Sequence, residues 1–310
     1  MIRLSQRPRV SVIVVVYRMP AQAMNTLVSL SAAHQRAVRA SDYEVIAVEN
    51  TSDAMLDRAA VEALGPNVRY LRRHEPGVSP SPAINAAAAT ARGSHIAVMI
   101  DGARMVTPGV VRGLLDAQRI AAVPVVAVPG YHLGDALHSQ AAATGYTAEA
   151  EQAWLAALDW RADGYRLFTR AVLSASCSNG FLMPMAESNC VAVPRRLFTT
   201  LGGFDETFTT PGGGYVNLDF YRRAVLSRGA RLVVLPGEGA FHQFHGGATT
   251  GAADSDHAAV VAGMQAEYRR LRGADYAPPE VPGVLLGEVH QAVAPFMAHS
   301  AEVLRAKVSA

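Results

Sequence analysis

Runs of apolar, mostly β-branched residues alternate with helix-like segments over the first third of the chain. The runs lie at 10–17, 43–49 and 94–100, and none shows the polar alternation of a half-exposed strand. Continuous runs of this kind are typical of strands buried on both faces of a parallel sheet. Helices are predicted between them, at 21–38, 54–64 and 83–91. This alternation predicts an α/β fold, with a mainly parallel central sheet flanked by helices.

The rest of the chain continues the pattern with longer connections. Strands are predicted at 123–129 and 231–236, and helices at 148–160 and 216–228. The last segment, 285–307, is predicted to be a helix with a kink at its proline, position 295.

The length fits one domain with an extension, because a single α/β domain can reach about 250 residues. We predict one domain at 1–250, divided into halves at about 9–105 and 106–250, and a helical extension at 251–310. The apolar positions of the last helix predict a packing or dimer-forming element.

Charge and composition argue against several classes of protein. The 28 basic and 26 acidic residues leave a net charge of only +2, which gives no global field for nucleic acid. Lys307 is the only lysine among the basic residues, which is typical of a GC-rich, bacterial genome. Cys177 and Cys190 are too few for a disulfide scaffold and lack zinc-site spacing, so we expect buried thiols. No stretch reaches the roughly 20 apolar residues of a membrane span, so we expect a cytoplasmic protein, with peripheral association with the inner membrane left open.

Two acidic residues follow predicted buried strands. Glu49 and Asp101 stand at strand ends, where open α/β sheets bind their ligands. No G-x-G-x-x-G follows the first strand, and neither G-x-x-x-x-G-K-[ST] nor G-x-S-x-G occurs. Dinucleotide-binding, P-loop and hydrolase functions therefore lose their main support.

Four segments together resemble one family. VSVIVVVYR, YEVIAVENTSD, PAINAAAATARGSHIAVMIDGA and SNCVAVPRRLFTTLGGFDETF follow one another in the order found in family 2 glycosyltransferases of the GT-A fold. The resemblance covers roughly residues 9–250. It implies transfer of a sugar, with inversion, from a nucleotide-sugar donor to a hydroxyl of a carbohydrate, lipid-linked or small-molecule acceptor, assisted by Mn²⁺ or Mg²⁺.

The resemblance also implies a donor site. The first strand-loops bind the nucleotide in this family, and a D-x-D motif holds the metal. Here the motif is Asp101-Gly102-Ala103, so the second carboxylate is missing and the chain is a divergent member. The residues expected to bind the donor are Val16, Tyr17, Glu49, Asn50, Arg73, Asn85, Asp101 and Gly102.

Replacement ligands are present in EGAFHQFHGG. Glu238, His242 and His245 fall within eight residues, and the resemblance implies that a histidine here reaches the metal. Asp101, His242 and His245 are therefore the expected ligands, with His242 preferred as the nearer to a strand end. Imidazole would favour Mn²⁺ over Mg²⁺. Arginines can share the diphosphate charge, and Arg72, Arg73 and Arg104 are nearest by motif position. The alternative is that the two histidines are unrelated loop residues.

The general base is expected from one of two segments. Where the family usually shows Glu-Asp, the chain reads GYVNLD, and Asp219 is its only carboxylate. Asp219 is the first choice and Glu187 the second, although the positive end of a helix dipole alone would explain Asp219. Acceptor or loop residues are expected at Gly213, Gly214, Asn217, Glu238 and Trp160, while Trp154 is assigned to the core. Trp160 is left open between core and acceptor platform.

Two other classes of function stay open. The altered motifs suit a catalytically impaired protein that binds a sugar nucleotide as a regulator or assembly partner. A nucleotidyltransferase is disfavoured, because no glycine-rich, lysine-bearing loop lies near the first strand.

Overall fold

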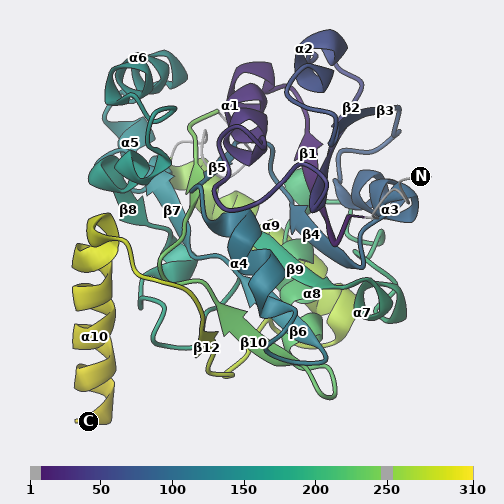
Figure 1. The fold of residues 1–310 in the computed structure, drawn as a ribbon. Coiled ribbons are helices and arrows are strands. Elements are labelled where there is room, and N and C mark those ends of the chain that lie inside the picture. The colour runs from purple at the N-terminus through teal and green to yellow at the C-terminus, as the bar shows by residue number, and fades with distance from the viewer. Residues whose placement is uncertain (1–7, 246–253, 310) are drawn as a thin grey trace.

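The computed structural model describes residues 8–245 and 254–309, and its centre is an eight-stranded sheet (Figure 1). The strand order is β12-β10-β6-β9-β4-β1-β2-β3, and β9 alone runs antiparallel to its neighbours. The strands are β1 (Val10–Val16), β2 (Tyr43–Asn50), β3 (Val68–Arg73), β4 (His95–Met99), β6 (Pro124–Ala127), β9 (Cys190–Pro194), β10 (Arg231–Val234) and β12 (Val284–Leu285). The predicted α/β class with a mainly parallel sheet is confirmed.

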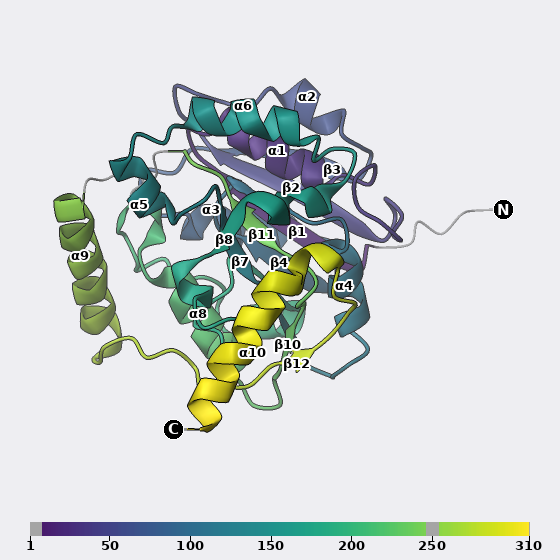
Figure 2. The same cartoon turned by 90° about the vertical axis from the view of Figure 1, so that its left-hand side faces the viewer.

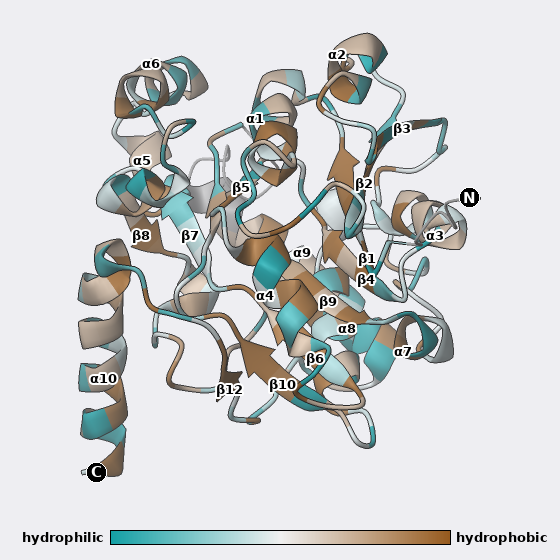
Figure 3. Cartoon of the chain, in the orientation of Figure 1, coloured by the Kyte–Doolittle hydropathy of each residue, from teal (hydrophilic) through white to brown (hydrophobic). Residues whose placement is uncertain are grey.

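Helices cover both faces of this sheet and make two apolar cores. On one face α1 (Pro20–Leu30), α2 (Arg58–Glu62) and α4 (Val110–Ala117) pack against Val10, Val12 and Val14 of β1. On the other face α3 (Ser81–Thr90), α7 (Arg195–Thr200) and α8 (Val216–Val225) pack against Ile13 and Val15. Successive strand residues point to opposite faces, so the apolar residues of β1 fill both cores. Figure 3 colours the chain by hydropathy, with hydrophobic residues in brown.

A smaller sheet lies beside the large one. It has the order β5-β11-β7-β8, formed by Arg104–Val106, Ala240–His242, Gly130–Leu133 and Ala171–Leu173. Strand β5 follows β4 closely in the chain, so this sheet begins beside the carboxyl end of β4. Helices α5 (His138–Ala143) and α6 (Ala148–Leu158) follow β7.

The predicted helix at 21–38 is shorter than expected. Helix α1 ends at Leu30, and Ser31 has extended backbone. The amide of Gln35 donates to the Ser29 carbonyl at 2.8 Å, so a side chain takes over a carbonyl that further helix would otherwise satisfy.

The C-terminal segment differs more. The predicted helix at 285–307 is wrong in its first part, because Val284–Leu285 pairs with β10 as strand β12. Helix α10 (Ala294–Val308) begins later, and Pro295 lies in its first turn, where no kink results. Helix α9 (Asp254–Arg272) lies on another side of the molecule from α10 (Figure 2). A role of α10 in self-association stays a prediction.

Within residues 8–245 and 254–309, no helix is both long and apolar enough to cross a membrane.

Candidate metal and donor site

Asp101 lies just beyond the carboxyl end of β4. Its Oδ1 accepts a hydrogen bond from the Ala103 N–H at 2.9 Å, which fixes the carboxylate in the turn. Its Oδ2 faces two imidazoles: it is 2.8 Å from Nε2 of His242 and 3.4 Å from Nε2 of His245. His242 is the last residue of β11, which pairs with β5, so the small sheet brings it to Asp101.

These three side chains form a compact set of metal ligands. The Nε2 atoms of His242 and His245 are 3.1 Å apart, so the three ligand atoms make a nearly equilateral triangle. A triangle of this size accommodates a cation at bond lengths of about 2.1 Å. Two histidines and one carboxylate leave coordination positions open, and this donor set suits Mn²⁺ or Fe²⁺ better than Mg²⁺.

The same contacts shift the pKa values of the cluster. Burial raises the pKa of Asp101, but the two imidazoles outweigh burial and hold it well below its usual range. Burial, aided by Arg104, lowers the pKa of His242 to about 3. Burial also lowers the pKa of His245, but the Asp101 carboxylate outweighs it, and the pKa is raised. The metal-free cluster therefore keeps a carboxylate, a neutral imidazole and an imidazole that binds protons readily.

Arg104 adds a buried positive charge. Its Cα pairs in register with that of His242, and its Nε lies 3.9 Å from Oδ2 of Asp101. The side chain is buried, yet Nε and Nη1 have no hydrogen-bond partner among the described residues. Unpaired buried guanidinium donors are costly, so they suit a site that receives an anion.

Five of the other expected donor residues lie at or next to this edge of the sheet. Val16 and Asn50 end β1 and β2, and Asn50 pairs in register with Arg73 of β3. A Cβ on Gly102 would lie 2.7 Å from the Val15 carbonyl, so the turn after β4 lies against the end of β1. Tyr17 follows β1 and is 44% exposed. Oδ1 of Asn50 is buried, and no group within residues 8–245 and 254–309 hydrogen-bonds to it.

Two expected donor residues have other partners. The Glu49 carboxylate is fully buried and accepts hydrogen bonds from the Leu56 N–H and the Tyr70 hydroxyl, so it holds the loop after β2. The Asn85 side chain bonds the backbone of Phe204 through both its oxygen and its nitrogen. Both act in the structure as supports of nearby turns.

Asp219, the first choice for general base, is paired with two arginines. Its Oδ2 accepts from Nε of Arg223 at 2.7 Å and its Oδ1 from Nε of Arg272 at 2.6 Å. The carboxylate is only 2% exposed, and Arg272 also pairs with Asp205. Both oxygens of the carboxylate are therefore occupied by guanidinium donors, which keep their charge at any working pH. The geometry therefore speaks against Asp219 as base and for a link between α8 and α9.

Glu187 lies nearer the sheet edge that carries Asp101. It precedes β9, whose first residue, Cys190, pairs with Met99 at the carboxyl end of β4. Oε2 of Glu187 accepts a hydrogen bond from the side chain of Asn217 at 3.0 Å. Within residues 8–245 and 254–309, no arginine forms an ion pair with it. Gly213 and Gly214 precede α8 with positive φ, and a Cβ on Gly213 would lie 2.7 Å from Val216.

Glu238 and Trp160 both contact other parts of the fold, Glu238 through hydrogen bonds and Trp160 through apolar packing. Glu238 accepts hydrogen bonds from the Thr107 and Tyr165 hydroxyls and from the Gly109 N–H. It precedes β11, whereas His242 ends that strand, so it does not join the histidines. Trp160 is 2% exposed and lies in the apolar core. These observations favour the core alternative for Trp160.

The family is decided by the match over the first half of the chain. Residues 11–174, which include β1 to β8 and Asp101, match the model of glycosyl transferase family 2. The chain belongs to this family. Its members are glycosyltransferases, so the resemblance found in the sequence is confirmed at this level.

Solved structures agree on the fold of this family 2 member. A mannosyltransferase from Pyrobaculum calidifontis, solved with GDP-Man and Mn²⁺, has a TM-score of 0.53 at 18% identity over 98% of this chain and 76% of its own. TarS residues 1–349 from S. aureus have a TM-score of 0.52 at 13% identity, over 96% and 70%. The same TarS fragment with UDP-GlcNAc has a TM-score of 0.51 at 14% identity, over 96% and 71%. No curated protein sequence matches the chain significantly.

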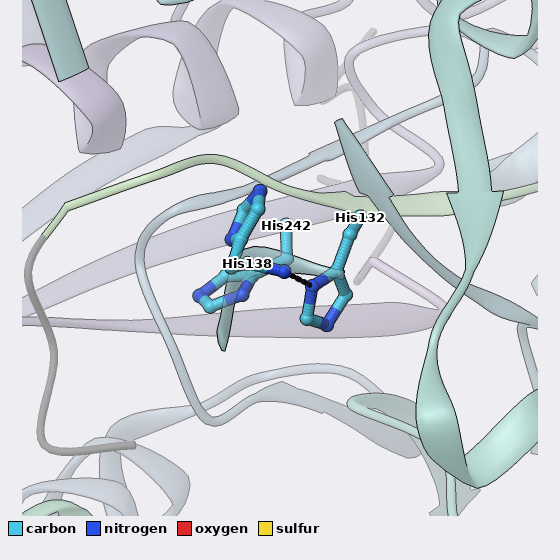
Figure 4. A group of neighbouring side chains, drawn as sticks. All are labelled: His132, His138 and His242. Atoms are coloured by element: carbon cyan, nitrogen blue, oxygen red, sulfur yellow. Dashed lines mark hydrogen bonds between the residues drawn. The ribbon is translucent and has the colours of Figure 1, made fainter. Parts of the chain in front are cut away.

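The sequence of this family 2 member did not single out two further histidines. His132 on β7 and His138 at the start of α5 lie next to His242 (Figure 4), with ring centroids 5.3 and 5.1 Å from it. Burial lowers the pKa of His138 to about 4 and lowers that of His132 further. Their spacing of six matches no metal motif, and only the pairing of β7 with β11 brings them to the site.

Proposed function

We propose that the protein transfers a sugar from a nucleotide-sugar donor to an acceptor hydroxyl, with a divalent cation at Asp101, His242 and His245. The observation that supports this most strongly is the triangle of these three ligand atoms at the carboxyl edge of the sheet. The missing second carboxylate of the D-x-D motif is replaced by imidazoles from β11 and the residues after it. Two structural neighbours were solved with GDP-Man and Mn²⁺ and with UDP-GlcNAc, which fits this class of donor.

The chain's own groups would hold the donor as follows. Val16, Asn50 and Arg73 line the strand ends that would receive the nucleoside, and Gly102 lets the turn that carries Asp101 pack closely against the end of β1. The unpartnered nitrogens of Arg104 would donate to a phosphate oxygen. The cation would supply neutralisation of the charge that grows on the diphosphate as the sugar leaves.

We propose Glu187 as the general base, in place of Asp219. Its second carboxylate oxygen is available to accept the proton of the acceptor hydroxyl, while Asn217 holds the first. Attack on the face of the sugar opposite the diphosphate would invert the anomeric centre. Gly213 and Gly214, whose backbone is freed by positive φ, would shape the acceptor side before α8.

Thermal unfolding against nucleoside diphosphates and sugar nucleotides, with and without Mn²⁺, tests the proposal. Binding to the native state raises the unfolding midpoint. We expect a shift that needs Mn²⁺ and one particular nucleoside, and that His245→Gln removes. Asp135→Asn is the matched control, because this side chain is 79% exposed and pairs with Arg170 at the surface. A shift without Mn²⁺ would assign the diphosphate to Arg104, and no shift with any nucleotide would contradict the proposal.

A second candidate, a sugar-nucleotide-binding protein without turnover, is favoured by one observation. Asp219 is fully paired with arginines and offers no base. This candidate expects the same Mn²⁺-dependent shift but no release of nucleoside diphosphate from the donor that binds. Donor hydrolysis, followed over hours with that donor, separates the two functions. Loss of hydrolysis in Glu187→Gln would support transfer.

A further inference from the structure

Two further histidines lie beside His242, whose Nε2 atom faces Asp101. His132, His138 and His242 each offer a ring nitrogen, and these nitrogens lie within 4.8 Å of one another (Figure 4). The backbone builds this group: His132 and His242 are register partners on β7 and β11, and α5 begins with His138. Three elements of the small sheet region thus meet at one point.

Two of these imidazoles are already oriented as metal ligands. Nε2 of His138 is 3.0 Å from the Leu133 carbonyl, and Nε2 of His242 is 2.8 Å from Oδ2 of Asp101. In metal sites the non-ligating N–H of a histidine almost always donates to a carbonyl or carboxylate in this way. The opposite atoms, Nδ1 of His138 and Nδ1 of His242, are buried and have no hydrogen-bond partner in the part of the chain that the structure describes.

We propose that His132, His138 and His242 form a second cation site, of the Zn²⁺ class, beside the Asp101 site. Neutral imidazoles without a carboxylate select zinc, cobalt or nickel over magnesium and calcium. Three protein ligands leave a fourth position for water, as in open zinc sites. His132 is the weakest of the three ligands, because its Nδ1 accepts the His138 N–H at 3.0 Å and must give up that bond.

The two sites share His242 and therefore compete. With a cation on its Nδ1, a neutral His242 keeps its proton on Nε2 and stays bonded to Asp101. With a cation on Nε2, the proton moves to Nδ1 and the three-histidine site loses a ligand. Zn²⁺ at the second site would thus weaken Mn²⁺ binding at the first. This consequence rests on the proposed function, whereas the cation site itself does not.

Cobalt and zinc binding to the full-length, metal-free protein tests the site. We expect one equivalent of Co²⁺ to give the visible absorption of a low-coordinate site and to be displaced by Zn²⁺. His138→Gln and His132→Gln should each weaken Zn²⁺ binding at least tenfold, in the range known for altered metal sites. His245→Gln and the exposed His74→Gln should leave Zn²⁺ binding unchanged. Far-ultraviolet circular dichroism checks that each variant folds. If His138→Gln does not fold, the test relies on His132→Gln, because His132 is only half-buried.

Two outcomes would overturn the site. One is that the wild-type chain binds no Zn²⁺ or Co²⁺. The other is that His245→Gln abolishes Zn²⁺ binding while His138→Gln and His132→Gln retain it, which would assign zinc to the Asp101 site alone. X-ray absorption at the zinc edge gives a second readout, with three imidazoles expected. Mn²⁺-dependent nucleotide binding is measured separately, so failure of the zinc site and failure of the proposed function are distinguishable.

Discussion

Two aspartates of this chain, the half-buried Asp101 and the buried Asp219, have opposite surroundings. Asp101 faces the imidazoles of His242 and His245, and a buried arginine with unpaired donors lies nearby. Asp219 is bound through both oxygens by the guanidinium groups of Arg223 and Arg272. Both lie in segments where the family places functional carboxylates, yet only Asp101 has partners that a cation can replace.

The difference lies in the chemistry of the partners. An imidazole loses its proton near neutral pH and can then bind a cation together with the carboxylate. A guanidinium keeps its charge at any working pH, so its carboxylate partner remains saturated. Asp101 therefore belongs to a site that can bind and release, and Asp219 to a fixed connection between α8 and α9. The predictions below test this contrast, from the largest expected effect to the smallest.

Asp101→Asn should lower Mn²⁺-dependent turnover of the donor roughly 10²- to 10³-fold, because a cation contributes several kcal/mol of charge stabilisation. Initial rates of nucleoside diphosphate release measure this effect. Asp135→Asn should keep the wild-type rate. Unchanged turnover in Asp101→Asn would remove this residue from the site.

Asp219→Ala should lower the free energy of unfolding by about 3 kcal/mol, because it leaves two arginines without their buried partner. This is the low end for a broken buried pair, since the side chains of Arg223 and Arg272 are 25% and 27% exposed. Urea unfolding measures the change. If Asp219→Asn instead kept its stability and lost turnover, Asp219 would regain its place as the base.

Glu238→Gln should lower the free energy of unfolding by about 1–2 kcal/mol, because a half-buried carboxylate that accepts hydrogen bonds from two hydroxyls and one N–H is replaced by an amide. Glu238 extends the comparison of Asp101 with Asp219, because its hydrogen-bond partners are neutral hydroxyl and amide groups. Mn²⁺ binding should be unchanged, and isothermal titration measures it. Weaker Mn²⁺ binding in a folded Glu238→Gln variant would place Glu238 in the metal site.

The smallest effect is a pH dependence of the metal-free protein. Asp101 raises the pKa of His245 above its unfolded value of about 6.5. The resulting stabilisation is fully present below that unfolded value and is lost as pH rises through the folded pKa. The difference in unfolding free energy between the wild-type chain and His245→Gln, measured with chelator, should therefore shrink as the pH rises above about 6.5. A constant difference would show that the pair does not titrate.

The fold followed from local patterns because each pattern has a local cause. Continuous apolar runs such as Val10–Val16 need burial on both faces, which a sheet with helices on both sides provides. The helix predicted after residue 276 was wrong in its first part because the structure there depends on a distant strand. Two apolar residues, Val284 and Leu285, are too short a pattern to predict a strand. They form one because they pair with β10.

The candidate site could be predicted only in part. Asp101 was marked by its place after a buried strand, and His242 and His245 by their proximity to one another in the sequence. The sequence placed Glu49 and Asn85 in equally plausible positions for binding the donor. In the structure the Glu49 carboxylate accepts a hydrogen bond from the Tyr70 hydroxyl, and the Asn85 amide donates one to the Phe204 backbone. Such partners lie 21 and 119 residues away, beyond the reach of any local pattern.

The sequence by itself determined the α/β class, the family resemblance and the strand-end position of Asp101, because hydrophobic periodicity and motif order are local properties. Only the tertiary structure decided which acids are free to act. It turned Asp219 toward Arg272, far along the chain, and it brought His132 and His138 to His242 through the pairing of β7 with β11. A side chain's partners set its chemistry, and those partners are chosen by packing between distant segments.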